Sequence, residues 1–173
     1  TYSLVNDSFQ NWKGMEEAGI RQVKRSINID MKSIRFLDKE LRDRLCRVPG
    51  LKQYIDSTEK KIGLPDKELT DLEAPFFNAS QLTNLGIFRF YTETYLTQNH
   101  LVDSTLPIIM RHLPPGENGL PLEINLFIKN TQFVPYENFQ SKIFEHLLAI
   151  INEFGLKVFQ QPTGDDLRTL SIK

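Results

Sequence analysis

The sequence predicts an α+β fold, a ferredoxin-like split βαβ sandwich with extra helices in its first crossover. Apolar residues alternate with polar ones in two separate segments, 22–30 and 120–130, as expected for strands with one buried face. Between and after these segments, apolar residues recur every three or four positions, as in amphipathic helices. The expected order is strand, helices, strand, hairpin, strand, helix, strand, which is the split βαβ order.

The first half of the chain is expected to hold strand remnants over residues 4–12 and a complete strand over 22–30. Asp38 suits the N-cap of a helix, because its carboxylate can accept from free N–H groups of the first turn. The apolar positions of this helix are Leu41, Leu45 and Val48. Pro49 suits the first turn of a second helix. Its apolar stripe is Leu51, Tyr54, Ile55 and Ile62. Residues 63–79 hold Pro65, Pro75, several acids and no period, which predicts a loop.

In the second half, Thr83 or Asn84 is expected to cap a helix. The apolar face of that helix is Leu85, Phe88, Tyr95 and Leu96. A strand over 108–113 and a turn over 114–119, which closes with Asn-Gly, predict a hairpin. The next strand has one buried face made by Leu122, Ile124, Leu126 and Ile128.

The last elements are a helix, a strand and a polar tail that begins at Pro162. The helix is expected from about Tyr136 to Phe154, and Gly155 stops it. It buries Phe139, Ile143, Leu147, Ile150 and Phe154. The last strand is expected over 156–160.

Composition excludes some classes of protein. The 173 residues carry 21 Lys and Arg against 22 Asp and Glu, a formal charge of -1, so the chain is not held to nucleic acid mainly by excess positive charge. Its longest apolar run is 147–151, far short of the roughly 20 residues that span a bilayer. The single cysteine, Cys46, cannot form an intramolecular disulfide and fits a reducing compartment. The chain starts within an apparent strand, which indicates a segment cut from a longer protein.

No motif for bond chemistry or metal binding stands out. The histidines His100, His112 and His146 are far apart in sequence, without an HExxH or CxxC pattern. Neither a GxSxG nucleophile motif nor a glycine-rich phosphate loop occurs. We therefore assign no catalytic, cofactor-binding or metal-binding residues, expect no cofactor, and do not expect an enzyme.

Three weaker candidates each have an ordinary interpretation that we favour. Asp165 and Asp166, near Thr163, could bind a divalent cation, but adjacent carboxylates in a polar tail are usually just exposed. Cys46 could be reactive because arginines lie nearby in sequence, but a half-buried helix cysteine is the simpler interpretation. Phe127 could stack an RNA base, but it is alone on the polar side of its strand, and packing explains it better.

Several segments resemble the miniconductance branch of the small-conductance-type mechanosensitive ion channels, in order and in spacing. They are NWKGM (11–15) with Arg21, KRSINID (24–30), LTNLG (82–86) with Phe88 and Arg89, GLPLEI (119–124), EFGL (153–156) and QQPTG (160–164). The resemblance covers most of the chain and is weakest over 62–79.

The resemblance implies a homo-oligomer, typically a heptamer, anchored in the bacterial inner membrane by transmembrane helices N-terminal to this segment. Residues 1–17 would be the C-terminal remnant of the channel's small β domain, and 18–173 the α/β domain that forms a vestibule on the cytoplasmic side. Inorganic ions and small solutes would pass through this vestibule on osmotic downshock. We expect self-association as the main partnership and no nucleic acid. The first crossover is longer than in the simplest family members.

Two other functions remain open. A ferredoxin-like regulatory module that binds a small molecule would need a pocket with converging polar groups. A small enzyme would need a set of catalytic groups, which the sequence does not single out.

Overall fold

The computed structural model describes residues 19–61, 82–129 and 132–161, and these form an α+β fold. A three-stranded antiparallel sheet has the order β1-β3-β2. Its strands are β1 (Arg21–Ile29), β2 (Ile109–His112) and β3 (Leu120–Ile128). The helices are α2 (Lys39–Leu45), α3 (Leu51–Lys61), α4 (Asn84–Thr97) and α5 (Phe133–Ile150), with short 3-10 turns η1 (Met31–Ser33) and η2 (Ile151–Phe154). The expected strand remnants over 4–12, the loop over 63–79 and the tail from Pro162 lie outside the described residues.

The alternating segments form the strands that the sequence predicts. β1 pairs with β3 along its whole length, from Arg21 opposite Ile128 to Ile29 opposite Leu120. The shorter β2 pairs with the other side of β3. Because side chains alternate between the two faces, this register places the apolar positions of β1 and β3 on one face.

The expected last strand over 156–160 is reduced to one antiparallel bridge, Ile29 with Val158. Backbone bonds flank the bridge on both sides, from the Asp30 N–H to the Lys157 carbonyl at 2.8 Å and from the Phe159 N–H to the Asn28 carbonyl at 2.8 Å. The Lys157 N–H donates to the side-chain hydroxyl of Ser33 at 3.0 Å and not to a strand carbonyl. This segment therefore pairs only with the end of β1, and the strand prediction was too long.

The structure confirms the hairpin that the Asn-Gly pair predicts between β2 and β3. The turn, however, does not adopt the conformation that this pair favours. Gly116 and Gly119 form a bridge, with backbone bonds of 3.0 and 3.1 Å in the two directions. A type I′ turn needs positive φ at both central residues. Here no residue other than glycine has positive φ among the described residues, and Gly119 itself takes φ 83°. Gly119 also lies against the Ile29 carbonyl, because an added Cβ would be 2.4 Å from that oxygen.

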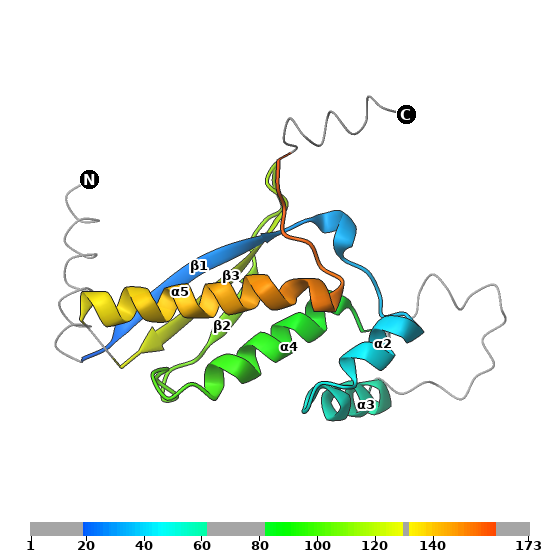
Figure 1. Ribbon diagram of the computed structural model, residues 1–173, viewed down its shortest axis with the longest axis horizontal. Helices are drawn as coiled ribbons and strands as arrows, with labels where there is room; N and C mark the ends of the chain where they lie inside the picture. Colours follow the sequence, from blue (N-terminus) through cyan, green and yellow to red (C-terminus); the bar gives the residue numbers. More distant parts are fainter. Residues whose placement is uncertain (1–18, 62–81, 130–131, 162–173) are drawn as a thin grey trace.

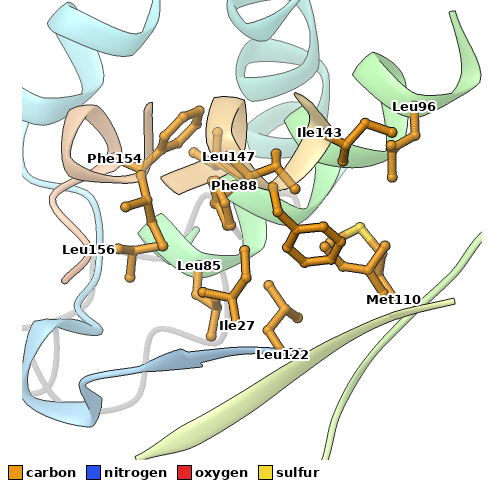
Figure 2. Packing of buried hydrophobic residues seen from close by; sticks show 14 of the residues in the cluster. Ile27, Leu85, Phe88, Leu96, Met110, Leu122, Ile143, Leu147, Phe154 and Leu156 are labelled. Carbon is orange, nitrogen blue, oxygen red and sulfur yellow. The ribbon is translucent and has the colours of Figure 1, made fainter. Parts of the chain in front are cut away.

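The hydrophobic core lies between the sheet and the layer formed by α4 and α5 (Figure 1). Figure 2 shows Phe88, Ile143 and Leu147 from the helices above Ile27 and Leu122 from the strands. These five side chains are at most 4% exposed. Burying one such side chain contributes about 1.5–3 kcal/mol, so this layer makes a large contribution to the stability of the fold. In the described parts of the chain, we find no helix with the length and apolarity needed to cross a bilayer.

Both predicted caps in the first crossover are present. Asp38 accepts from the Leu41 N–H at 2.8 Å, and this bond is the main cause that lowers the pKa of Asp38. Thr83 is the N-cap of α4 and accepts from the Gly86 N–H at 3.0 Å. The helix predicted to begin at Pro49 instead begins at Leu51.

Asn84, the other candidate cap, has a different role. It is fully buried, and its amide joins α4 to the segment that follows η1. Its Nδ2 donates to the Ser33 carbonyl at 2.9 Å, and its Oδ1 accepts from the Arg35 N–H at 3.0 Å and from the Leu85 N–H at 2.9 Å. One side chain therefore satisfies backbone groups that are far apart in sequence.

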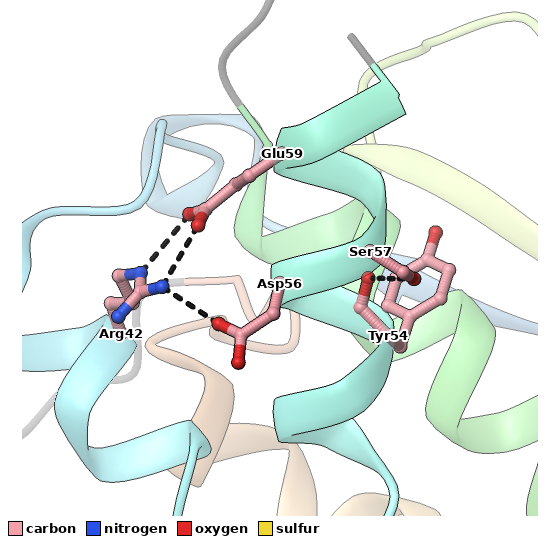
Figure 3. A network of polar contacts seen from close by, with 5 residues as sticks. All are labelled: Arg42, Tyr54, Asp56, Ser57 and Glu59. Atoms are coloured by element: carbon pink, nitrogen blue, oxygen red, sulfur yellow. Dashed lines mark hydrogen bonds and ion pairs between the residues drawn. The ribbon is translucent and has the colours of Figure 1, made fainter. Parts of the chain in front are cut away.

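The remaining crossover helices, α2 and α3, are joined to each other by one arginine (Figure 3). Arg42 donates to both carboxylate oxygens of Glu59, at 3.0 and 2.8 Å, and to Asp56 at 2.9 Å. The paired hydrogen bonds lower the pKa of Glu59. Tyr54 of α3 stacks on Phe90 of α4, with 3.6 Å between the ring centroids, and so connects this pair to the main helix layer.

The last helix confirms its predicted end, although its geometry changes before that end. The α-helical part stops at Ile150, and η2 continues to Phe154. Gly155 then takes φ 68°, the left-handed conformation that ends helices. The helix also starts earlier than predicted, at Phe133.

Candidate functional site

The face of the sheet opposite α4 and α5 is the first candidate surface. The register places Lys24 of β1, Arg111 of β2, and Glu123, Asn125 and Phe127 of β3 on this face. Each alternates with a core residue of its strand. The apolar positions of the same strands are already used by the core, so this face is polar at its centre.

Glu123 lies at the middle of the open face, between two cations. Arg111, directly opposite, donates from Nε to Glu123 Oε1 at 2.8 Å. Lys24 Nζ lies 3.8 Å from Oε2, on the other side. The Glu123 side chain is 8% exposed, whereas those of Lys24 and Arg111 are 52% and 56% exposed. One carboxylate thus links three strands, and the cluster presents a net positive charge to solvent.

One further hydrogen bond and two apolar side chains lie on the same face as this cluster. Gln22 Nε2 donates to Asn125 Oδ1 at 2.9 Å, between β1 and β3. Ile109 is 42% exposed on the same face of β2. Phe127 is half-buried and is the single aromatic side chain that the three described strands place here. A platform that stacks several bases needs more than one ring, and these three strands supply one on this face.

The histidines singled out in the sequence are not brought together. His100 lies in the turn after α4, His112 on β2 and His146 on α5. Desolvation and the charge of Arg89 lower the pKa of His112. Within residues 19–61, 82–129 and 132–161, no group of three or more His, Cys, Asp or Glu residues could hold a metal ion. Asp165, Asp166 and Thr163 lie outside the described residues.

Cys46 lies half-buried at the C-cap of α2. The nearby Arg42 is already engaged by Glu59 and Asp56 (Figure 3). The structure favours a packing role for this cysteine.

An aromatic cluster on the outer side of the helix layer was not predicted from the sequence. His146 stacks on Tyr95, with 4.3 Å between the ring centroids. Its Nε2 lies 2.8 Å from the hydroxyl of Tyr91. Burial raises the pKa of Tyr91. Tyr91 and Tyr95 are four residues apart, a spacing that places them on one helix face, but no sequence signal connects them to His146.

A groove next to this cluster, between α4 and α5, is the second candidate surface, with a volume of about 380 Å³. In comparisons with known proteins, no family model matches the chain and no solved structure matches it significantly.

Proposed function

We propose that this chain is the cytoplasmic vestibule domain of a small-conductance-type mechanosensitive ion channel of the miniconductance branch. In this proposal the domain takes part in assembly and in filtering the ions and solutes that leave on osmotic downshock, and it performs no bond chemistry. The observation that carries the proposal is the series of sequence segments from 11–15 to 160–164, which resemble that branch in order and in spacing. The fold is compatible with it.

We further propose that the fold is the ferredoxin-like split βαβ type. The order β1-β3-β2 supports this, because β3 lies between β1 and β2 and antiparallel to both. The bridge between Val158 and Ile29 adds the last segment beside β1, where a fourth strand belongs in this type. The extra helices α2 and α3 belong to the first crossover, before β2.

The open sheet face supports a place in the wall of the vestibule. A sheet covered by helices on one side leaves its other side for solvent or for a neighbour. Here the centre of that side is an ion-paired cluster, Lys24–Glu123–Arg111, rather than an apolar patch. Polar faces of this kind suit the wall of a water-filled vestibule in a homo-oligomer. The N-terminal region of the whole channel would anchor it in the bacterial inner membrane, and this domain would lie on the cytoplasmic side.

The test uses the whole natural gene that encodes this chain, expressed in bacteria that lack their own mechanosensitive channels. We expect improved survival after osmotic downshock and stretch-activated currents in membrane patches. Neither effect should occur with a gene that ends before residue 18 of this sequence and so lacks the α/β domain. If the whole gene gives neither survival nor stretch-activated current, although the protein reaches the membrane, the proposed function is wrong.

A matched pair of variants tests the part played by the open face. Lys24→Glu places a second carboxylate beside Glu123 on an exposed position, whereas Lys60→Glu makes the same charge change on α3. If the face contributes to assembly, Lys24→Glu should lower the fraction of oligomer in the purified whole protein and Lys60→Glu should not. Equal oligomer fractions, measured by light scattering, would exclude this face from the interface.

A regulatory module that binds a small molecule is the second candidate function. The groove between α4 and α5 favours it, since it combines an apolar floor with polar walls. The parent reading frame separates the two candidates. Several apolar segments of roughly 20 residues upstream of Thr1 favour the channel, and a soluble upstream domain favours the module.

A further inference from the structure

The groove between α4 and α5 lies on the outer side of the helix layer, away from the open sheet face. It has a volume of about 380 Å³, within the range of roughly 300–1,000 Å³ that is typical of small-molecule sites. Its lining comes from the end of α4, the turn after it and the first half of α5. The lining residues are Tyr95, Asn99, His100, Leu101, Pro135, Asn138, Phe139, Lys142 and Ile143.

The floor of the groove is apolar and rigid. Phe139 and Ile143 are 4% and 2% exposed, so they belong to the core and present only an edge to the groove. Leu101 and Pro135 are half-buried beside them. The Leu101 N–H is already bonded to Asn99 Oδ1 at 3.0 Å, which holds the turn after α4 in place. A ligand with an apolar body would gain contact here without reordering the backbone.

One wall is preorganised by the aromatic cluster. Tyr95 lines the groove, and its ring stacks on His146. His146 is in turn held by the hydroxyl of Tyr91 at 2.8 Å. The ring of Tyr95 is therefore fixed before any ligand arrives, which reduces the entropy that binding would cost.

The charge of the groove favours an anion. The described residues that line it include Lys142, His100, Asn99 and Asn138, and none of them carries a carboxylate. Within the described residues, Lys142 forms no ion pair. Glu93 and Glu145 are exposed on the two helices but do not line the groove. A lysine with no acidic partner beside an apolar floor can pair with a carboxylate of a ligand while the floor contacts the rest.

We propose that this groove binds a small organic carboxylate with a flat apolar body. The carboxylate would contact Lys142 and the amide of Asn138 from α5, and the apolar body would lie on Leu101, Phe139 and the ring of Tyr95. This site is separate from the open sheet face, and it does not depend on the proposed channel function.

The test is a titration of the full 173-residue chain with phenylacetate, followed by amide chemical shifts in NMR spectra. We expect shifts that concentrate at Asn99, Leu101, Asn138 and Lys142, with a dissociation constant of about 1 mM, as is usual for a ligand of roughly ten non-hydrogen atoms. Phenylacetamide, which has the same shape without the charge, should bind at least about fivefold more weakly. Phenethylamine and inorganic phosphate should give no saturable shifts at these residues.

Three variants separate the site from general attraction between charges. Lys142→Gln should weaken phenylacetate binding about 5–10-fold. Lys60→Gln, which removes the same charge from an exposed lysine of α3, should leave it unchanged. Asn138→Trp, at an exposed position, should block the groove while keeping Lys142. All three sites are on the surface, so the variants should fold, and circular dichroism checks this.

Several outcomes would overturn the proposal. These are shifts that avoid the groove, equal binding of phenylacetate and phenylacetamide, saturable binding of phosphate at the same residues, or an equal effect of Lys142→Gln and Lys60→Gln. A channel test that fails while phenylacetate binds in the groove would reject the proposed function alone. The reverse result would reject only the groove.

Discussion

Replacing Asn84 by alanine should destabilise this fold far more than an ordinary substitution on a helix. The side chain is fully buried at the start of α4, and its amide bonds to the Ser33 carbonyl, the Arg35 N–H and the Leu85 N–H. Alanine has none of these groups. The connection between β1 and α2 would then lose its side-chain bonds to α4 and keep only backbone bonds, such as that from the Asn84 N–H to the Arg35 carbonyl at 3.0 Å.

The expected magnitude follows from the groups left without partners. An unsatisfied buried backbone donor or acceptor costs about 1–3 kcal/mol. The Leu85 N–H belongs to the first turn of a helix, where N–H groups commonly lack a helical partner, so we count only Ser33 and Arg35. The bond to the Ser33 carbonyl is buried, whereas the bond from the Arg35 N–H is only partly buried, so the two together give a loss of about 2–4 kcal/mol in the free energy of unfolding, with part of it recovered if water enters.

The assay is urea unfolding followed by circular dichroism, with the denaturant slope fitted for each variant. Thr83→Ala removes a single cap bond and should cost about 1 kcal/mol. Asn138→Ala, at an exposed helix position, should change stability by about 0.5 kcal/mol or less. If Asn84→Ala loses no more than Thr83→Ala at an unchanged slope, the buried link is not what holds this connection, and the reasoning is refuted.

Two further predictions concern the hairpin and the loop before β2. Gly119→Ala should cost more than Gly50→Ala in urea unfolding: both have positive φ, which costs an alanine about 1–2 kcal/mol, but only at Gly119 would the new Cβ meet a backbone oxygen, that of Ile29 at 2.4 Å. Equal losses would contradict the clash. The hydrogen bonds from Thr105 lower the pKa of Asp103, so this carboxylate stabilises the fold above its ordinary pKa of 3.8, and that contribution is lost as the pH falls through the lower folded value. Thr105→Val should therefore raise the pKa of Asp103 in a carboxyl NMR titration and weaken the loss of stability below about pH 4, whereas an unchanged titration would rule out this cause.

Local patterns were sufficient for most of the elements. The alternation in β1 and β3, the caps Asp38 and Thr83, and the stop at Gly155 each depend on neighbours close in sequence, and the structure confirms them. The ends of elements were less certain. α5 starts before Tyr136 and finishes as a 3-10 turn, because packing on the core and not periodicity decides where regular hydrogen bonding stops.

The candidate surfaces could be predicted only in part. The polar positions of β3 indicated a face that is not part of the core, and Glu123 is one of them. Its pairing with Lys24 and Arg111 could not be predicted, because it requires the register of three strands. Predicting the groove would require still more information about the tertiary structure. Its walls come from α4 and α5, and their relative position depends on how both helices pack on the sheet.

The sequence by itself determined the α+β class, the order of the elements, the caps and which face of each strand is buried. These depend on period, turn chemistry and backbone conformation, all of which act over a few residues. The tertiary structure alone decided that 156–160 pairs only at Val158, that Asn84 links two distant segments, and that Lys142, which forms no ion pair within the described residues, lies beside an apolar floor. Each of these depends on the distance between groups separated by many residues, and that distance is set by the packing of helices on the sheet.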